Sequence, residues 1–128
     1  MSDALIAAAL DARENAFAPY SRFKVGAALE DSDGRIHAGC NVENATYGLT
    51  VCAERVALYK AISEGVRKFR RMAIAAGTDA LTPPCGACRQ VLWEFCGDIE
   101  IMLVNLRGAS ESCRLKDLFP RPFDVSFL

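Results

Sequence analysis

Three cysteines and one glutamate are the residues of this chain whose types and spacing suggest chemistry. Cys85 and Cys88 stand in the stretch PPCGACRQ, and their C-x-x-C spacing suits a redox thiol pair, a disulfide or half of a metal site. Cys52 lies in VCAER and is followed two residues later by Glu54. The choice among these chemistries depends on where the fold brings the four residues.

The length and composition favour one soluble domain. The chain has 128 residues, 52% hydrophobic and 24% charged, which suits a single domain over residues 1–128 with its own core. No apolar run of about 18 residues predicts a membrane span, and the N-terminus lacks the basic region of a secretion signal. We therefore expect a cytoplasmic protein without a membrane partner. Its six cysteines would stay reduced there, which disfavours the disulfide.

The charge balance gives no general attraction for a polyanion. The 15 basic and 16 acidic residues leave a net charge of −1. The local exception is RKFRR, residues 67–71, where basic side chains around an aromatic residue could contact phosphates. A short basic run before a strand is more often a solvated surface. We therefore expect no nucleic-acid partner.

The hydrophobic pattern alternates between helices and strands. Helices are predicted at residues 2–15, 51–64 and 85–95. Strands are predicted at residues 22–30, 35–43, 71–77 and 99–105, and the turn DSDG joins the first two in a hairpin. A short strand and a helical turn, LKDLF, are predicted in the tail from Cys113. This order predicts a layered α/β sandwich.

Two of the predicted helices begin at the cysteines. Side chains in a first turn tilt toward the helix N-terminus, so the sulfurs of Cys52, Cys85 and Cys88 can converge beyond two helix starts. The positive helix ends would stabilise thiolates there. Three protein ligands leave the fourth position of a tetrahedral zinc open, as in catalytic sites. Because a redox pair would leave Cys52 unexplained, we favour one zinc ion per chain.

Glu54 lies in the same predicted turn as Cys52. A glutamate at a helix start, taken alone, is usually a surface residue. Beside an open zinc position its carboxylate could act as a general acid and base. The combination C-x-E followed by P-C-x-x-C corresponds to the signature of zinc deaminases, with cysteine in place of histidine. In that chemistry zinc activates the water that attacks C4 of cytosine, and the glutamate moves the protons.

Four separated motifs carry a resemblance to a known family. They are APYSRFKVGAAL, GCNVENATYG, the CAER box and PPCGACRQ. Over nearly its whole length the chain resembles the small tetrameric cytidine deaminases. The resemblance implies a three-layer α/β/α sandwich with a mixed five-stranded sheet. It also implies hydrolytic deamination of cytidine and 2′-deoxycytidine in pyrimidine salvage, with Cys52, Cys85 and Cys88 as zinc ligands and Glu54 as proton shuttle.

The resemblance also suggests how a nucleoside is held. Asn41 and Glu43 are two residues apart on a predicted strand, so they share a face, and a glutamate with an amide suits a sugar diol. The resemblance implies that this pair holds the ribose 3′-hydroxyl. It further implies that Phe23 lines the base pocket, with core packing as the alternative. Ala53 would offer a backbone contact to the base.

Positive charge is expected beside the sulfurs. Three thiolates and Zn²⁺ sum to −1, which weakens the metal as a Lewis acid unless nearby charge offsets it. The resemblance implies that Arg55, helped by Gln90, hydrogen-bonds the cysteine sulfurs. The alternative for Arg55 is a solvated position on the helix.

The tail FPRPFDVSFL carries more apolar surface than one small domain obviously needs. The resemblance implies a homotetramer in which Phe123 reaches a neighbour's pocket and stacks on the pyrimidine. Tyr47 would lie near a subunit contact. Phe119 stands where the family pattern has leucine, which leaves the register of the tail open. The alternative for Phe123 is that it anchors the tail to its own core.

The remaining candidate residues suggest structural roles. His37 is interpreted as structural or exposed, and Cys40, Cys96 and Cys113 as packing residues without metal-ligand spacing. Two other functions stay open. One is deamination of a different substrate, either a modified nucleoside or a polynucleotide cytosine, although NVENA favours a free nucleoside. The other is a zinc-stabilised binding module without activity.

Overall fold

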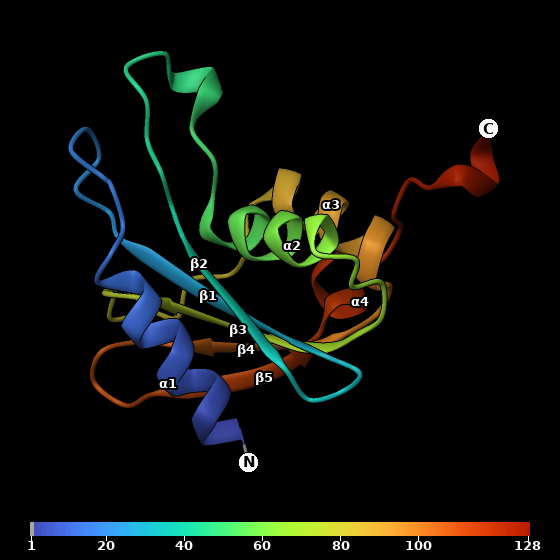
Figure 1. The fold of residues 1–128 in the computed structure, drawn as a ribbon, viewed down its shortest axis with the longest axis horizontal. Coiled ribbons are helices and arrows are strands. Elements are labelled where there is room, and N and C mark those ends of the chain that lie inside the picture. Colours follow the sequence, from blue (N-terminus) through green and yellow to red (C-terminus); the bar gives the residue numbers. More distant parts are fainter. Residues whose placement is uncertain (1) are drawn as a thin grey trace.

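A five-stranded sheet lies at the centre of the computed structural model, which describes residues 2–128 (Figure 1). In chain order the elements are α1 (Ser2–Arg13), β1 (Val25–Asp31), β2 (Ile36–Cys40), η1 (Tyr47–Leu49), α2 (Ala53–Ser63), β3 (Phe69–Ala76), α3 (Gly86–Cys96), β4 (Glu100–Val104), β5 (Ser110–Arg114), α4 (Leu115–Leu118) and η2 (Val125–Phe127). The predicted alternation of helices and strands is confirmed. The two 3₁₀ turns, η1 and η2, were not predicted.

The sheet has the strand order β2-β1-β3-β4-β5 and is mixed. β3 and β4 are parallel because α3 carries the chain back across the sheet between them, and the other neighbours are antiparallel. The predicted β1–β2 hairpin is present. Its turn is stabilised by Asp31, whose carboxylate accepts the backbone N–H groups of Asp33 at 2.9 Å and Arg35 at 3.0 Å. The mixed five-stranded sheet expected from the sequence is therefore confirmed.

Helices cover both faces of the sheet. α1 packs on one face, while α2, α3 and α4 lie on the other (Figure 1). Successive strand residues point to opposite faces, so the central strands supply two cores. On β3, Met72 and Ile74 join the core under α2 and α3, whereas Ala73 and Ala75 join the core under α1. This is the expected three-layer α/β/α sandwich.

Two glycines let helices approach the strands at backbone distance. A Cβ on Gly26 of β1 would lie 2.0 Å from the carbonyl oxygen of Ala9 in α1. A Cβ on Gly39 of β2 would lie 2.6 Å from the backbone nitrogen of Ala57 in α2. Side chains at these positions would push the helices outward. The height of α2 above the sheet, and with it the position of its first turn, is set by this contact.

Two predicted strands are shorter than expected. The strand predicted over residues 22–30 begins only at Val25, because Arg22 adopts a left-handed conformation with φ 61°. The strand predicted over residues 35–43 ends at Cys40. Beyond it the backbone of residues 41–43 pairs with Phe17 and Val51 instead of continuing the hairpin. The side chain of Asn41 also bonds to the backbone, accepting from Val25 at 2.9 Å and donating to Phe23 at 2.7 Å. The residues predicted on these strand ends therefore lie in loops.

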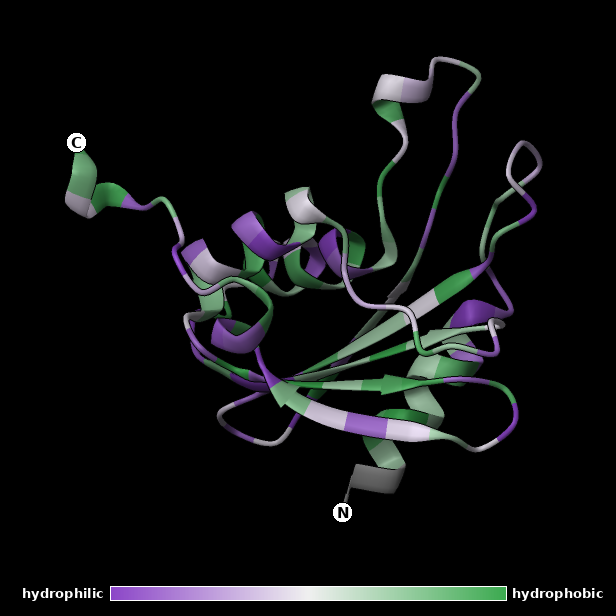
Figure 2. Ribbon diagram, turned by 180° about the vertical axis from the view of Figure 1, so that it is seen from behind, coloured by the Kyte–Doolittle hydropathy of each residue, from purple (hydrophilic) through white to green (hydrophobic). Residues whose placement is uncertain are grey.

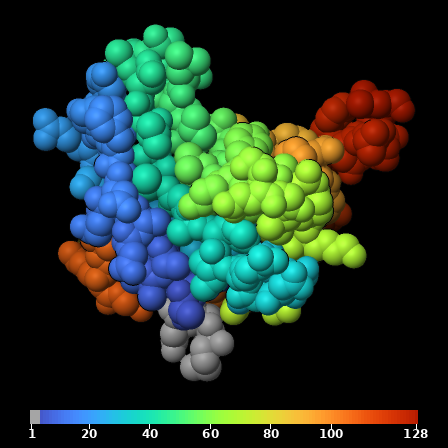
Figure 3. All heavy atoms as spheres, in the orientation of Figure 1, coloured from blue at the N-terminus to red at the C-terminus, as the bar shows by residue number. Residues whose placement is uncertain are grey.

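The end of the chain also differs in detail from the prediction. The strand expected in the tail is β5, which begins at Ser110, before Cys113, and the helical turn is α4. Beyond it the tail projects from the body, as does the loop that contains η1 (Figure 3). Figure 2 colours much of this projecting end hydrophobic. Among the described residues, no helix combines the length and the apolar character that crossing a bilayer requires.

Candidate active site

Three cysteine sulfurs meet where α2 and α3 begin. Cys52 is the residue before α2 and Cys85 the residue before α3, while Cys88 lies in the first turn of α3. Neither N-cap side chain bonds to the helix backbone, so both sulfurs are free to point outward. The three Sγ atoms lie within 4.8 Å of one another. The predicted convergence of these sulfurs is therefore present in the fold.

The spacing of the sulfurs fits a metal ion. Sulfurs bound at about 2.3 Å to a tetrahedral zinc stand roughly 3.8 Å apart. The Sγ atoms of Cys52 and Cys85 are 3.8 Å apart. A set of three thiolates suits zinc, which prefers sulfur and nitrogen ligands in tetrahedral geometry. Among the described residues this is the group of cysteine, histidine or acidic side chains that is placed to hold a metal.

Hydrogen bonds support negative charge on the sulfur of Cys52. The pKa of Cys52 is lowered to about 5, first by the hydrogen bond from Cys88 and then by the guanidinium of Arg55. The pKa of Cys88 is raised, because its proton is held against the Cys52 sulfur. Arg55 Nη2 donates to Cys52 Sγ at 3.4 Å. Arg55 therefore lies where the sequence predicted it, against a cysteine sulfur rather than in solvent.

Glu54 is buried beside these sulfurs and is not a surface residue. Its exposed fraction is 5%, although it occupies the first turn of α2, where acidic side chains are usually solvated. Burial raises the pKa of its carboxyl to about 7, and the charge of Cys52 acts in the same direction. A carboxyl group with a pKa near neutrality can both accept and release protons at physiological pH.

A cavity of about 280 Å³ connects Glu54 with the predicted nucleoside residues. The predicted residues that line it are Phe23, Asn41, Glu43, Cys52, Ala53, Glu54 and Cys85. They come from the segment before β1, the segment after β2 and the starts of α2 and α3. Phe23 is 39% exposed, so its ring lines a surface rather than filling the core. The structure brings most of the predicted site to one hollow.

Asn41 and Glu43 border this cavity with different surroundings. Asn41 is buried and uses its amide mainly on its own chain, at Val25 and Phe23. Glu43 accepts three hydrogen bonds, from the backbone N–H groups of Tyr20 and Ser21 and from the Ser21 hydroxyl. The Ser21 hydroxyl, together with the two backbone donors, lowers the pKa of Glu43. Glu43 is thus a fixed, ionised carboxylate at the cavity wall.

Three predicted residues lie away from this cavity. Gln90 donates to the backbone carbonyl of Phe123 at 2.8 Å, which differs from the expected bond to a cysteine sulfur. The Phe123 ring is 55% exposed and stacks on Phe127, with ring centroids 5.7 Å apart, so it is not packed into its own core. Tyr47 is 75% exposed, and its ring meets that of Tyr20 edge to face with the ring centroids 6.1 Å apart.

Several lining residues were not predicted from the sequence. They are Ser21, Val25, Thr50, Ile74, Thr82 and Pro83. Five of them stand within three positions of a predicted residue, so adjacency to the motifs was the available signal. Ile74 on β3 offered no such signal, because the sequence pattern of a buried strand residue is the same whether it lines a cavity or fills the core.

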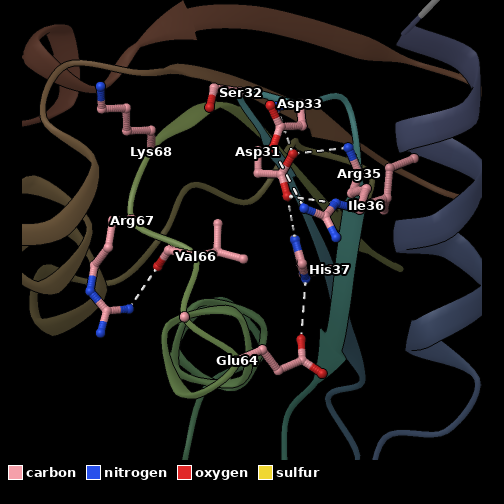
Figure 4. Close-up of a pocket in the computed structure, with 11 residues that line it drawn as sticks. Asp31, Ser32, Asp33, Arg35, Ile36, His37, Glu64, Val66, Arg67 and Lys68 are labelled. Atoms are coloured by element: carbon pink, nitrogen blue, oxygen red, sulfur yellow. Dashed lines mark hydrogen bonds and ion pairs between the residues drawn. The ribbon is translucent and has the colours of Figure 1, made fainter.

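A second cavity, of about 820 Å³, lies at the β1–β2 turn beside the end of α2 (Figure 4). The ring of His37 lies in the wall of this cavity, between two carboxylates. Its Nε2 is 2.9 Å from Asp31 Oδ2, and its Nδ1 is 3.5 Å from Glu64 Oε1. The predicted structural role of His37 is consistent with these contacts. Cys96 and Cys113 pack against the core beside α3, and burial raises the pKa of Cys96 to about 12.

Comparisons with known proteins decide the family. Residues 1–104 match the model of the cytidine and deoxycytidylate deaminase zinc-binding region. The chain belongs to this family. It is 50% identical over 127 residues to cytidine deaminase of Sporosarcina psychrophila, covering 96% of this chain and 93% of that protein. It is 52% identical over 120 residues to cytidine deaminase of Halalkalibacterium halodurans, covering 93% and 91%.

Solved structures of deaminases have the same fold. The crystal structure of cytidine deaminase from Burkholderia pseudomallei superposes with a TM-score of 0.92 at 49% identity, covering 96% of this chain and 99% of that chain. Cytidine deaminase from Mycobacterium tuberculosis superposes with a TM-score of 0.83 at 40% identity, covering 96% and 97%. The family's zinc-binding region spans the three converging cysteines, so zinc is the metal that this site takes.

Proposed function

We propose that this chain is a cytidine deaminase, which hydrolyses cytidine and 2′-deoxycytidine to uridine and 2′-deoxyuridine with release of ammonia. One observation carries the proposal: the buried carboxylate of Glu54 opens into the same cavity as the cysteine sulfurs of the family's zinc-binding region. A carboxylate and a metal in one cavity are the parts that hydrolytic deamination requires.

The metal is held by Cys52, Cys85 and Cys88, one zinc ion per chain. Bound there, zinc supplies a Lewis acid that lowers the pKa of water toward neutrality. The positive ends of α2 and α3 favour the thiolate form of these ligands. Arg55 offsets part of their negative charge, and its buried Nε has no hydrogen-bond partner among the described residues. Gln90, on the helix α3 that begins at the cysteines, donates a hydrogen bond to the backbone carbonyl of Phe123 and so fixes the tail beside this helix.

Glu54 carries the protons of the reaction. In its ionised form the carboxylate accepts one proton from the attacking water and delivers it to N3 of cytosine. It then accepts the second proton from the hydroxyl newly bonded to C4 and delivers it to the amino group, which leaves as ammonia while the C4=O bond forms. Its burial prevents bulk water from competing for these protons. One residue with a pKa near 7 serves all these transfers without a second acid.

The nucleoside occupies the cavity with its base toward Glu54 and its sugar toward Glu43. Phe23 flanks the base, and the backbone of Ala53 contacts its edge. Glu43 accepts a hydrogen bond from the ribose 3′-hydroxyl, and Asn41 donates to the same hydroxyl with an amide hydrogen that its own chain leaves free. The cavity's place at the junction of loops and helix starts supports this orientation.

The active species is a homotetramer whose sites are shared between subunits. Phe123 reaches a neighbour's cavity and stacks on the pyrimidine, and Tyr47 lies at a subunit contact. The support is exposure: both aromatic rings lie on segments that project from the body (Figure 3). Exposed aromatic side chains on projecting segments gain stability when a partner covers them.

The proposed setting is pyrimidine salvage in the cytoplasm. All six cysteines are free in the structure, which suits a reducing compartment. A net charge of −1 supports a small nucleoside as substrate rather than a nucleic acid. One catalytic domain over residues 1–128 carries the whole activity.

The decisive experiment is an absorbance assay of cytidine conversion by the purified protein, with and without a zinc chelator. We expect conversion to uridine that the chelator abolishes and added zinc restores. Comparison with a modified cytosine nucleoside and with single-stranded DNA tests the other substrates. Zinc binding without conversion of any of these compounds would mean that the site is structural.

A further inference from the structure

The segment between α1 and β1 forms one wall of the candidate active site. Residues 20–23 of this segment belong to no helix or strand. Arg22 within it has φ 61°, which is uncommon for a residue other than glycine. Ser21 and Phe23, on either side of Arg22, both line the cavity. An unusual backbone conformation between two lining residues points to a segment whose shape is held by specific contacts.

The Ser21 hydroxyl makes two of these contacts. It donates to Oε2 of Glu43 and accepts the backbone N–H of Phe23 at 3.0 Å. One oxygen atom therefore joins the carboxylate proposed for the sugar to the backbone that carries the ring proposed for the base. The left-handed turn at Arg22 brings the Phe23 N–H within reach of this hydroxyl.

The contacts of Glu43 show what the serine contributes. A carboxylate offers about four acceptor positions. The backbone N–H groups of Tyr20 and Ser21 occupy Oε1 at 2.9 and 3.1 Å, and the Ser21 hydroxyl occupies Oε2. This leaves Oε2 one acceptor position, with an orientation fixed by the other three bonds. The backbone donors hold one oxygen only, so the rotation of the other depends on Ser21.

We propose that Ser21 is a positioning residue for the sugar: its hydroxyl orients Oε2 of Glu43 toward the nucleoside 3′-hydroxyl. The proposal rests on the proposed function, in which Glu43 binds that hydroxyl. Ser21 itself contacts no reacting atom and acts through Glu43. Its effect is therefore on nucleoside binding and not on the proton transfers of Glu54.

The test is the steady-state kinetics of Ser21→Ala. Losing a hydrogen bond to a charged group is expected to raise KM for cytidine about 10- to 100-fold. The kcat should stay near the parent's value, which is the signature of lost uniform binding. Ser21→Thr keeps a hydroxyl and should recover most of the affinity. A Ser21→Thr chain as impaired as Ser21→Ala, or an unchanged KM in Ser21→Ala, would overturn the proposal.

The chain offers a matched control and a matched substrate. Ser112 donates to Oε2 of Glu100 on neighbouring strands, away from the cavity, so Ser112→Ala removes the same kind of contact and should leave KM unchanged. With 3′-deoxycytidine, the KM values of the parent and Ser21→Ala should converge, because the hydroxyl that Glu43 binds is missing. An undiminished difference on this substrate would show that Ser21 acts by general stability.

Epistasis separates this proposal from the proposed function. Ser21→Ala combined with Glu43→Gln should bind cytidine no worse than Glu43→Gln alone. Additive losses in the double variant would contradict action through Glu43. If the parent protein converts no cytidine, the proposed function fails. If it converts cytidine and the Ser21 variants behave normally, only the role of Ser21 fails.

Discussion

At the residue scale, Glu54 is the group on which turnover depends in the proposed mechanism. Replacing it with Gln keeps the size and the hydrogen-bonding capacity of the side chain but removes its ability to move protons. We expect kcat to fall by at least 10²–10⁴-fold, the usual range for a general acid or base. Zinc content, measured by elemental analysis, should stay at one per chain. Near-normal turnover in Glu54→Gln would mean that another residue shuttles the protons.

The guanidinium of Arg55 contacts the sulfur of Cys52 at 3.4 Å, and in the proposed site it supports the metal through this ligand. Removing a partner of this kind usually costs 10- to 100-fold in metal affinity or activity. We therefore expect Arg55→Ala to lose zinc to a competing chelator at a correspondingly lower chelator concentration. Arg107→Ala, which removes an exposed arginine paired with Asp79, is the control and should retain zinc like the parent. Equal retention in both variants would contradict the role of Arg55.

Residue-scale roles were predictable where they depend on local sequence. Cys52, Glu54 and Cys85 were found because a helix start and a short motif place them together. The amide of Gln90 bonds to the carbonyl of Phe123, 33 residues away, and no local pattern carries that contact. Ser21 was missed for the same reason, since its partner Glu43 lies 22 residues further along the chain.

At the element scale, the hairpin of β1 and β2 is fastened to the end of α2 by His37. The ring lies between Asp31 at the end of β1 and Glu64 just after α2 (Figure 4). α2 also packs against β2 at Gly39. Because the first turn of α2 carries Glu54, this contact holds the far end of the helix that positions the catalytic carboxylate.

The same network predicts how stability depends on pH. The hydrogen bond from His37 is the main reason why the pKa of Asp31 is lowered. A carboxyl with a lowered folded pKa contributes stability above its unfolded pKa, near 4, and loses it as the pH falls through the folded value. Asp31→Asn should therefore be less stable than the parent from pH 7 to about 5, with a difference that shrinks below about pH 4.

Denaturant unfolding of both chains at several pH values measures this difference. Asp33→Asn is the matched control, because Asp33 is exposed in the same turn and pairs only with the exposed Arg35. Its stability should follow that of the parent across the range. A difference between Asp31→Asn and the parent that persists unchanged to pH 3 would show that the stabilisation does not come from ionised Asp31.

Element-scale structure was predictable where the hydrophobic period is clear and failed at the ends. Both helix starts at the cysteines and the strands β3 and β4 were located within about two residues, since apolar periodicity reports burial directly. The strand ends at residues 22–24 and 41–43 were misplaced because the hairpin pairing ends there and the backbone of residues 41–43 pairs with Phe17 and Val51 instead. Asn41 bonds to the backbone across the gap, and Arg22 turns the chain, and neither effect has a periodic signature.

At the scale of the whole molecule, the described chain carries apolar surface that its own core does not cover. Phe123, Phe127 and Leu128 are 55%, 69% and 91% exposed on a tail that projects from the body (Figures 2 and 3). Gln90 and Trp93 on α3 hold the root of this tail, at the carbonyl of Phe123 and at Asp124. The tail is therefore anchored beside α3 at the backbone of Phe123 and at Asp124, while its aromatic rings are exposed, as in a segment that reaches a neighbour.

Mixing two inactive chains tests whether the tail completes a neighbour's site. A Glu54→Gln chain keeps Phe123 but cannot move protons, and a Phe123→Ala chain keeps Glu54 but donates no ring. In a mixed tetramer, some sites combine Glu54 of one chain with Phe123 of the other. After random mixing of equal amounts, about a quarter of the sites should be sound, and activity should rise above that of either parent.

The control replaces the Phe123→Ala chain with one that carries both substitutions. Mixed with Glu54→Gln chains, it forms tetramers in which no site has Glu54, so no activity should return. Subunit exchange is verified by native mass spectrometry, which also reports the oligomeric state. Recovery only in the first mixture means that the ring acts in trans, because a ring serving its own chain would leave every site of both mixtures defective. Verified exchange without recovery, or full activity from a monomeric species, would confine Phe123 to its own subunit.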